Sequence, residues 1–140
     1  MNYTPDFITN LSDNEIFVFG SNIHGMHGGG AAKMACRKFG AEWGVGVGKT
    51  GQCYAIPTMH GGIEEIKPFV DDFIDYAKEH VEFHFLVTRI GCGIAGFTDM
   101  QMAPLFDGLL EQDNVSLPRE WVTILKTNNL FLNYHFKYEK

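Results

Sequence analysis

The residues of this chain that could do chemistry gather in two glycine-rich stretches. The first follows an apolar run at 16–19 and holds Ser21, Asn22 and His27 among glycines at positions 25, 28, 29 and 30. Glycine lets the backbone approach a ligand, and a helix start after it offers unpaired N–H groups to an anion. Asn22 can donate and accept hydrogen bonds, so it can contact ribose hydroxyls or orient a water. The stretch predicts a phosphate-bearing ligand; a loop that Asn22 merely caps is the alternative.

The second stretch runs from Gly91 to Gly96 and reads Gly-Cys-Gly-Ile-Ala-Gly. It fits the G-x-G-x-x-G pattern of Rossmann dinucleotide sites. However, a cap at Thr98 or Asp99 would start the helix after the glycines, and too little chain follows for a second nucleotide-binding half. A Rossmann-like NAD-binding oxidoreductase is therefore only an alternative. Cys92 is a candidate nucleophile, but the sequence identifies no base for it, which favours a small buried loop residue.

Two other patterns are incomplete. Gly48, Lys49 and Thr50 match the end of a P-loop, but that motif needs a glycine where Trp43 stands. The histidines and cysteines lack the spacing of zinc sites. We therefore predict no metal site and no cofactor.

Composition limits the class of protein. The chain has 140 residues, 45% apolar and 20% charged, which predicts one folded domain over residues 1–140. Its formal net charge of −6 argues against sequence-independent nucleic-acid binding. Three cysteines without a CxxC motif, no signal-peptide pattern and no membrane-length apolar run predict a cytoplasmic protein without a membrane partner.

Strand-like and helix-like segments alternate along the chain, which predicts an α/β fold. The expected strands are 16–20, 53–57 and 83–90, and the expected helices are 31–39, 64–80, 100–111 and a short one after Ser116. Alternating apolar and polar residues at 130–138 predict a final strand, within an extra edge strand over 127–140 through which copies of the chain would pair. Both glycine-rich stretches follow strands, so we expect them to face one crevice at the strands' carboxyl ends.

This pair of loops resembles that of the macro domain family. In that family a strand ends in Ala-Ala-Asn, and Gly-Gly-Gly-Val precedes a helix; here Gly20-Ser21-Asn22 and Gly28-Gly29-Gly30-Ala31 stand in those places. The family's second loop, similar to Ile-Ser/Gly-Thr-Gly-Ile-Phe-Gly, is matched by Ile90–Phe97. The strand between them is matched by Gly51–Pro57. The resemblance covers residues 16–106 and is closest to small, divergent macro-like proteins of bacteria and phages.

The resemblance implies a three-layer α/β/α sandwich with a mixed central sheet that binds ADP-ribose or a related NAD-derived nucleotide. Asn22 matches the asparagine that contacts the distal ribose in hydrolytic members, and His27 would lie beside the reacting carbon. These two are the implied catalytic residues for hydrolysis of an ADP-ribosyl or phosphate ester bond. The implied ligand-binding residues are Ser21, Asn22, Gly28, Gly29, Gly30, Ala31, Gly91, Cys92, Gly93, Ile94, Ala95, Gly96 and Phe97.

The chain also departs from the family in ways that favour binding over catalysis. Ala31 and Ala32 stand where some hydrolytic members carry an acid, and the Gln-Glu-Glu pattern of poly-ADP-ribose glycohydrolases is missing. Asp6 is the candidate for the aspartate that reads adenine, although its spacing to Asn22 is short. A non-catalytic reader or sequestering protein for a signalling nucleotide is therefore the main alternative, and an oligomeric structural protein is another.

Overall fold

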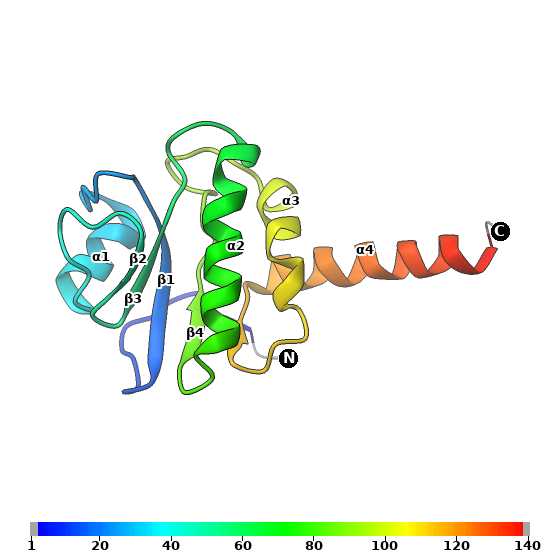
Figure 1. The fold of residues 1–140 in the computed structure, drawn as a ribbon, viewed down its shortest axis with the longest axis horizontal. Helices are drawn as coiled ribbons and strands as arrows, with labels where there is room; N and C mark the ends of the chain where they lie inside the picture. Colours follow the sequence, from blue (N-terminus) through cyan, green and yellow to red (C-terminus); the bar gives the residue numbers. More distant parts are fainter. Residues whose placement is uncertain (1–2, 139–140) are drawn as a thin grey trace.

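A computed structural model of the chain describes residues 3–138, with side chains up to residue 132. Figure 1 shows strands and helices alternating along most of the chain. In order, the elements are β1 (Glu15–Ser21), α1 (Gly30–Lys38), β2 (Gly48–Thr50), β3 (Cys53–Pro57), α2 (Ile63–Glu79), β4 (His84–Val87), α3 (Asp99–Met102), the 3-10 helix η1 (Ala103–Leu109), β5 (Val115–Ser116) and α4 (Arg119–Tyr138).

The five strands form one mixed sheet in the order β2-β3-β1-β4-β5. Strand β1 pairs in parallel with β3 and β4, β4 pairs in parallel with β5, and only β2 is antiparallel to its neighbour. The predicted α/β fold with a mixed sheet is thus confirmed. The chain leaves β1 toward β3 and later crosses to β4 on the other side, so the strand order reverses at β1. Ligands of open α/β sheets bind at such a switch point, beyond the carboxyl ends of the strands.

Strand β1 is buried on both faces, as its unbroken apolar run predicts. Ile16 and Val18 belong to one apolar cluster, which also contains residues of α2, η1 and α4. Phe17 and Phe19 belong to a second cluster, with Ala35 of α1 and residues near the N-terminus. Packing on both faces fixes the position of β1 and therefore of the loop that begins at its carboxyl end.

The predicted helix over 100–111 divides into α3 and η1. Pro104 lies within the first two residues of η1. Proline has no backbone N–H to donate to the carbonyl four residues earlier, which explains why the α-helical ladder stops near Met102. Helix α2 agrees with its prediction to within one residue at each end.

The predicted C-terminal strand at 130–138 is wrong. Residues 119–138 form one helix, α4, whose distal part projects away from the rest of the fold (orange to red in Figure 1). The amides of Trp121 and Val122 donate to the Pro118 carbonyl at its start, and no glycine or proline follows to end it. The alternation of apolar and polar residues was misleading here: Leu130, Phe131 and Leu132 are all exposed, so in this described part of the segment no buried face selects the apolar positions. Because these residues are helical, the predicted pairing of two copies through a C-terminal edge strand has no strand to form it.

Several apolar side chains of α4 are exposed, Leu130 by 70%. Even so, within the described residues no helix is both long and apolar enough to cross a bilayer.

Candidate functional site

The two glycine-rich stretches line one cleft at the carboxyl edge of the sheet, as expected. This cleft, here called the loop cleft, has a volume of about 550 Å³. Segments that follow β1, β3 and β4 all contribute to it. Its lining residues are Gly20, Ser21, Asn22, Met26, Gly28, Gly29, Gly30, Ala31, Ala32, Thr58, Met59, Thr88, Arg89, Ile90, Gly91, Gly93, Ile94 and Ala95.

A second hollow of about 620 Å³ adjoins the loop cleft. We call it the Asp6 hollow, because residues 4–9 form one wall; Phe17, Met34, Pro118 and Glu120 also line it. Gly30, Ala31, Thr88 and Arg89 line both spaces, so the two lie directly next to each other. Each volume is typical of a small-molecule site, and together they could hold an elongated ligand.

Backbone N–H groups without protein acceptors border the loop cleft from two sides. Helix α1 begins at Gly30 with no side-chain cap, so its first amides are free of intrahelical partners. Across the cleft, the amides of Gly93, Ile94 and Ala95 have no acceptor among the described residues. Free amides at a helix start and in a glycine loop are the groups that hold phosphates in proteins of any net charge.

Asn22 lines the cleft, but its side chain is also part of its own loop. Its Nδ2 donates to the Met26 carbonyl at 2.9 Å, and its Oδ1 accepts from the Met26 amide at 3.0 Å. Asn22 therefore caps the loop, which was the alternative that the sequence left open. Each of its polar atoms can still form one more hydrogen bond, so contact with a ligand remains compatible with this geometry.

The structure does not place His27 in the cleft. Its side chain is only 2% exposed and packs against Phe19 with ring centroids 5.3 Å apart. Nε2 lies 3.0 Å from the Glu42 carbonyl and 3.1 Å from that of Val45, so it must be the protonated, donating nitrogen. His27 thus joins the loop to residues 42–45 behind it, and the predicted catalytic role loses its geometric basis. The sequence missed this because it shows which loop carries a histidine, not which way the side chain turns.

The second loop also divides into two parts. Gly91, Gly93, Ile94 and Ala95 line the cleft, whereas Cys92, Gly96 and Phe97 do not. Phe97 packs on the larger apolar cluster. The Cys92 thiol lies 3.5 Å from Asp99 Oδ1. Burial, together with this carboxylate, raises the pKa of Cys92 to about 11. The thiol therefore stays protonated at neutral pH, which disfavours Cys92 as a nucleophile.

Arg89 is a cleft residue that the sequence reading missed. Its Nε donates to Asp99 Oδ1 at 3.0 Å and its Nη2 to Asp99 Oδ2 at 2.7 Å. Trp121 Nε1 also donates to Asp99 Oδ1, at 2.7 Å. The Asp99 carboxylate, which belongs to α3, is thus hydrogen-bonded to Arg89 just after β4 and to Trp121 of α4. The signal that could have revealed it is a lone arginine at the end of an apolar strand, directly before a glycine loop.

Asp99 gives the fold a specific pH dependence. Its hydrogen bond with Arg89, and further those with Trp121 and Cys92, hold the pKa of the Asp99 carboxyl below its ordinary value of 3.8. A carboxyl whose pKa is lower in the folded state stabilises the fold at any pH above its ordinary pKa. This contribution to the free energy of unfolding is lost as the pH falls from the ordinary pKa through the lowered one. We expect the stability advantage of the wild type over Asp99→Asn to shrink in that range. Urea unfolding of both proteins at a series of pH values measures it; a constant difference would contradict the assignment.

Several other histidine and cysteine side chains have identifiable structural partners or positions. Among the described residues no three His, Cys, Asp or Glu side chains are grouped so that they could hold an ion. His60 Nε2 instead accepts from the Ile23 amide at 2.8 Å, which joins two loops at the rim of the cleft. Burial raises the pKa of Cys53 to about 12, consistent with a core residue.

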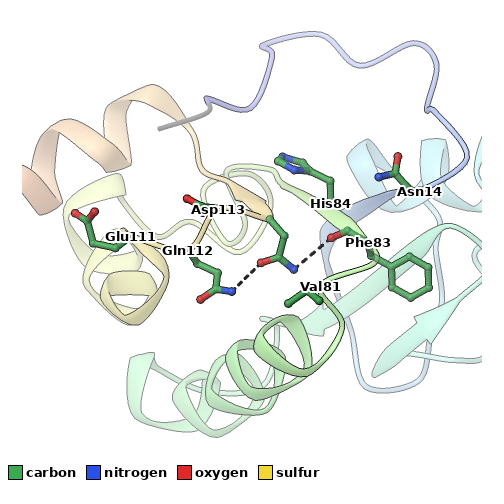
Figure 2. Close-up of a pocket in the computed structure, with 8 residues that line it drawn as sticks. Asn14, Val81, Phe83, His84, Glu111, Gln112 and Asp113 are labelled. Carbon is green, nitrogen blue, oxygen red and sulfur yellow. Dashed lines mark hydrogen bonds between the residues drawn. The ribbon is translucent and has the colours of Figure 1, made fainter.

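A third hollow, of about 450 Å³, lies at the amino ends of β1, β4 and β5, the end of the sheet opposite the loop cleft. Figure 2 shows the residues that line it. Three of its polar side chains, those of His84, Gln112 and Asn114, form hydrogen bonds within the fold. Asn114 accepts from Gln112 at 2.9 Å and donates to the Phe83 carbonyl at 3.2 Å, as the dashed lines show, while His84 Nε2 lies 2.7 Å from Ser116 Oγ. This hollow is bordered by the amino ends of parallel strands, where α/β sheets rarely bind ligands.

The chain matches no protein-family model, no curated protein and no solved structure.

Proposed function

We propose that this protein binds ADP-ribose or a related NAD-derived nucleotide in the loop cleft and the Asp6 hollow. The observation that carries the proposal is the pair of free amide groups, at the start of α1 and at residues 93–95, on two sides of one cleft. The proposal includes a macro-like, three-layer sandwich, which the packing of both faces of β1 supports.

The ligand is oriented by the different chemistry of the two spaces. Asp6 lines the Asp6 hollow beside the apolar residues Ile8 and Phe17. The apolar residues suit an adenine ring, and the Asp6 carboxylate can accept a hydrogen bond from the adenine amino group. The phosphates then reach the free amides, and the distal ribose lies near Asn22. In this arrangement Asp6, the candidate for the family's adenine-reading aspartate, takes that role.

Binding is supported more directly than turnover. The hydrolysis we propose as an extension would use Asn22 and the loop amides to orient a water at the distal ribose. The spare hydrogen-bonding capacity of Asn22 permits this, but the buried position of His27 removes one of the two implied catalytic residues. A non-catalytic reader of a signalling nucleotide is favoured by the same observation.

Calorimetry with ADP-ribose, AMP and NAD tests the proposal. A ligand at about 100 times its dissociation constant adds about 2.7 kcal/mol to the free energy of unfolding, so a thermal shift should accompany the heat of binding. Following an ADP-ribosylated or phosphorylated substrate in the same samples distinguishes a hydrolase from a reader. Absence of ADP-ribose binding at millimolar ligand would refute the proposed function.

Gly93→Ala is expected to block the cleft without harming the fold. A Cβ at Gly93 would have no protein atom within 4 Å, and because Gly93 lines the loop cleft, it would project into the open space that the proposal assigns to the ligand. Overpacking typically costs about 1–3 kcal/mol, so we expect affinity to fall by about tenfold or more while stability changes little. Gly108→Ala is the matched control, because its Cβ would make only an ordinary contact with Ile74 at 3.8 Å. Equal ligand affinity in both variants would show that Gly93 does not line the ligand site.

A further inference from the structure

Arg89 occupies the junction between the loop cleft and the Asp6 hollow and lines both. We propose that its guanidinium recognises an anionic group of the ligand, and that Asp99 positions it for this purpose. The proposal rests on the proposed function, because it requires a ligand that extends through both spaces. It adds a charged, specificity-determining contact to a site that otherwise offers neutral backbone donors.

The hydrogen bonds of Arg89 leave part of its guanidinium available. Of its five N–H donors, the Asp99 carboxylate engages one on Nε and one on Nη2. The Arg89 side chain is 56% exposed, whereas that of Asp99 is 21% exposed. The arginine is thus fixed on its inner side and open on its outer side.

Asp99 is itself held in place by neighbours. Trp121, which is fully buried, donates to it at 2.7 Å, and the Cys92 thiol lies 3.5 Å away. A guanidinium fixed before binding loses less conformational freedom when a ligand arrives, so more of the contact contributes to affinity. Arginine is also the residue that best matches the planar oxygen geometry of phosphate and carboxylate groups.

The charges around the cleft point to an anion as the group recognised. Arg89 is the single cation among the residues that line the two spaces, where Asp6 and Glu120 are the acids. The whole chain carries a net charge of −6, so its general field repels anions. A local positive group beside free backbone amides offsets that repulsion where the two spaces meet. Neutral nucleosides would gain nothing from it, so Arg89 would select nucleotides over nucleosides.

A purely structural role is the rival interpretation, in which Arg89 only anchors the 91–97 loop through Asp99. The two roles predict different effects of salt. If Arg89 contacts a ligand anion, Arg89→Gln removes a charge contact and makes binding less sensitive to salt. Asp99→Asn would instead leave the guanidinium uncompensated and make binding more sensitive to salt. If the pair is only structural, both variants weaken binding together and leave the salt dependence unchanged.

The test measures the dissociation constants of ADP-ribose and of pyrophosphate at low and high ionic strength. The proteins are wild type, Arg89→Gln, Arg89→Lys, Asp99→Asn and the charge-matched control Arg37→Gln, whose exposed arginine lies in the last turn of α1. We expect Arg89→Gln to weaken ADP-ribose binding by about tenfold or more at low salt, Arg89→Lys by less, and Arg37→Gln hardly at all. The proposal would be overturned if Arg89→Gln bound ADP-ribose as tightly as the wild type. It would also be overturned if Arg89→Gln and Asp99→Asn lost affinity to the same extent and both kept the salt dependence of the wild type.

The outcomes separate this inference from the proposed function. If wild type binds ADP-ribose and Arg89→Gln binds it equally well, the proposed function stands and the role of Arg89 falls. If wild type binds only pyrophosphate, and does so through Arg89, the anion contact stands and the nucleotide assignment falls. If wild type binds neither probe, both are refuted.

Discussion

Replacing Trp121 with alanine is expected to lower the free energy of unfolding by about 3–5 kcal/mol. The side chain is fully buried, and its ring packs on Phe106 with centroids 5.0 Å apart. The change leaves a large cavity where α4 meets the core, and it removes the indole donor from Asp99. Because small domains are stable by only about 5–15 kcal/mol, the loss is a substantial part of the total. Urea unfolding followed by circular dichroism measures it.

Trp121→Phe separates the two contributions. Phenylalanine keeps an aromatic ring in the core but cannot donate to Asp99, so we expect a smaller loss of stability than with alanine. A hydrogen bond to a charged group contributes about 1.5–3 kcal/mol, and this sets the scale of the phenylalanine effect. If the alanine variant lost less than about 1 kcal/mol, the start of α4 would not be part of the core in solution.

The sequence indicated the position of the cleft because that position follows from topology. Parallel strands have their carboxyl ends on the same side of the sheet, so the two glycine loops that follow the neighbouring strands β1 and β4 had to lie close together. The glycines, Ser21 and Asn22 could be identified in this way. A site that binds an anion through backbone amides needs few specific side chains, so the positions of the glycines were enough to indicate where it lies.

Side-chain direction could not be predicted in the same way. His27 and Cys92 stand in the expected loops, yet both turn away from the cleft toward partners elsewhere in the chain. The link between Arg89, Asp99 and Trp121 joins three elements that only the tertiary fold brings together. No local spacing rule connects an arginine with a carboxylate 10 residues later and an indole 22 residues beyond that.

The hydrogen bonds of Asn22 and His27 on one side of the cleft, and those of Asp99 on the other, hold the two walls of the cleft in place. On one side, Asn22 and His27 fix the first glycine loop against Met26 and residues 42–45. On the other side, Asp99 fixes the end of β4. Amides held in this way need little rearrangement when an anion binds, which is how neutral backbone groups become effective ligands. The first wall can be tested by a change that adds a single carbon atom behind it.

Gly46→Ala is expected to disrupt the first glycine loop and abolish measurable ligand binding. A Cβ at Gly46 would lie 2.0 Å from the Asn22 carbonyl oxygen and 2.8 Å from the Ile23 carbonyl group. Backbone at this distance must move, and Asn22 would move with it, away from the cleft. Forcing an extra carbon into a packed site costs about 1–3 kcal/mol of stability, so the fold should survive while the loop shifts. Calorimetry with ADP-ribose, together with backbone amide spectra, measures both effects.

The neighbouring change Val47→Ala serves as the control, since Val47 is 42% exposed and the substitution adds no atom to the loop. We expect it to bind ligand as the wild type does, and its amide spectrum to change only near residue 47. In Gly46→Ala the spectral changes should instead extend through residues 22–27, because the Asn22 carbonyl lies in the path of the new Cβ. Wild-type affinity in Gly46→Ala, accompanied by those same spectral changes, would show that the loop can move without affecting the ligand. Asn22 would then lie outside the binding site, and the recognition would belong to residues 89–95 and the Asp6 hollow alone.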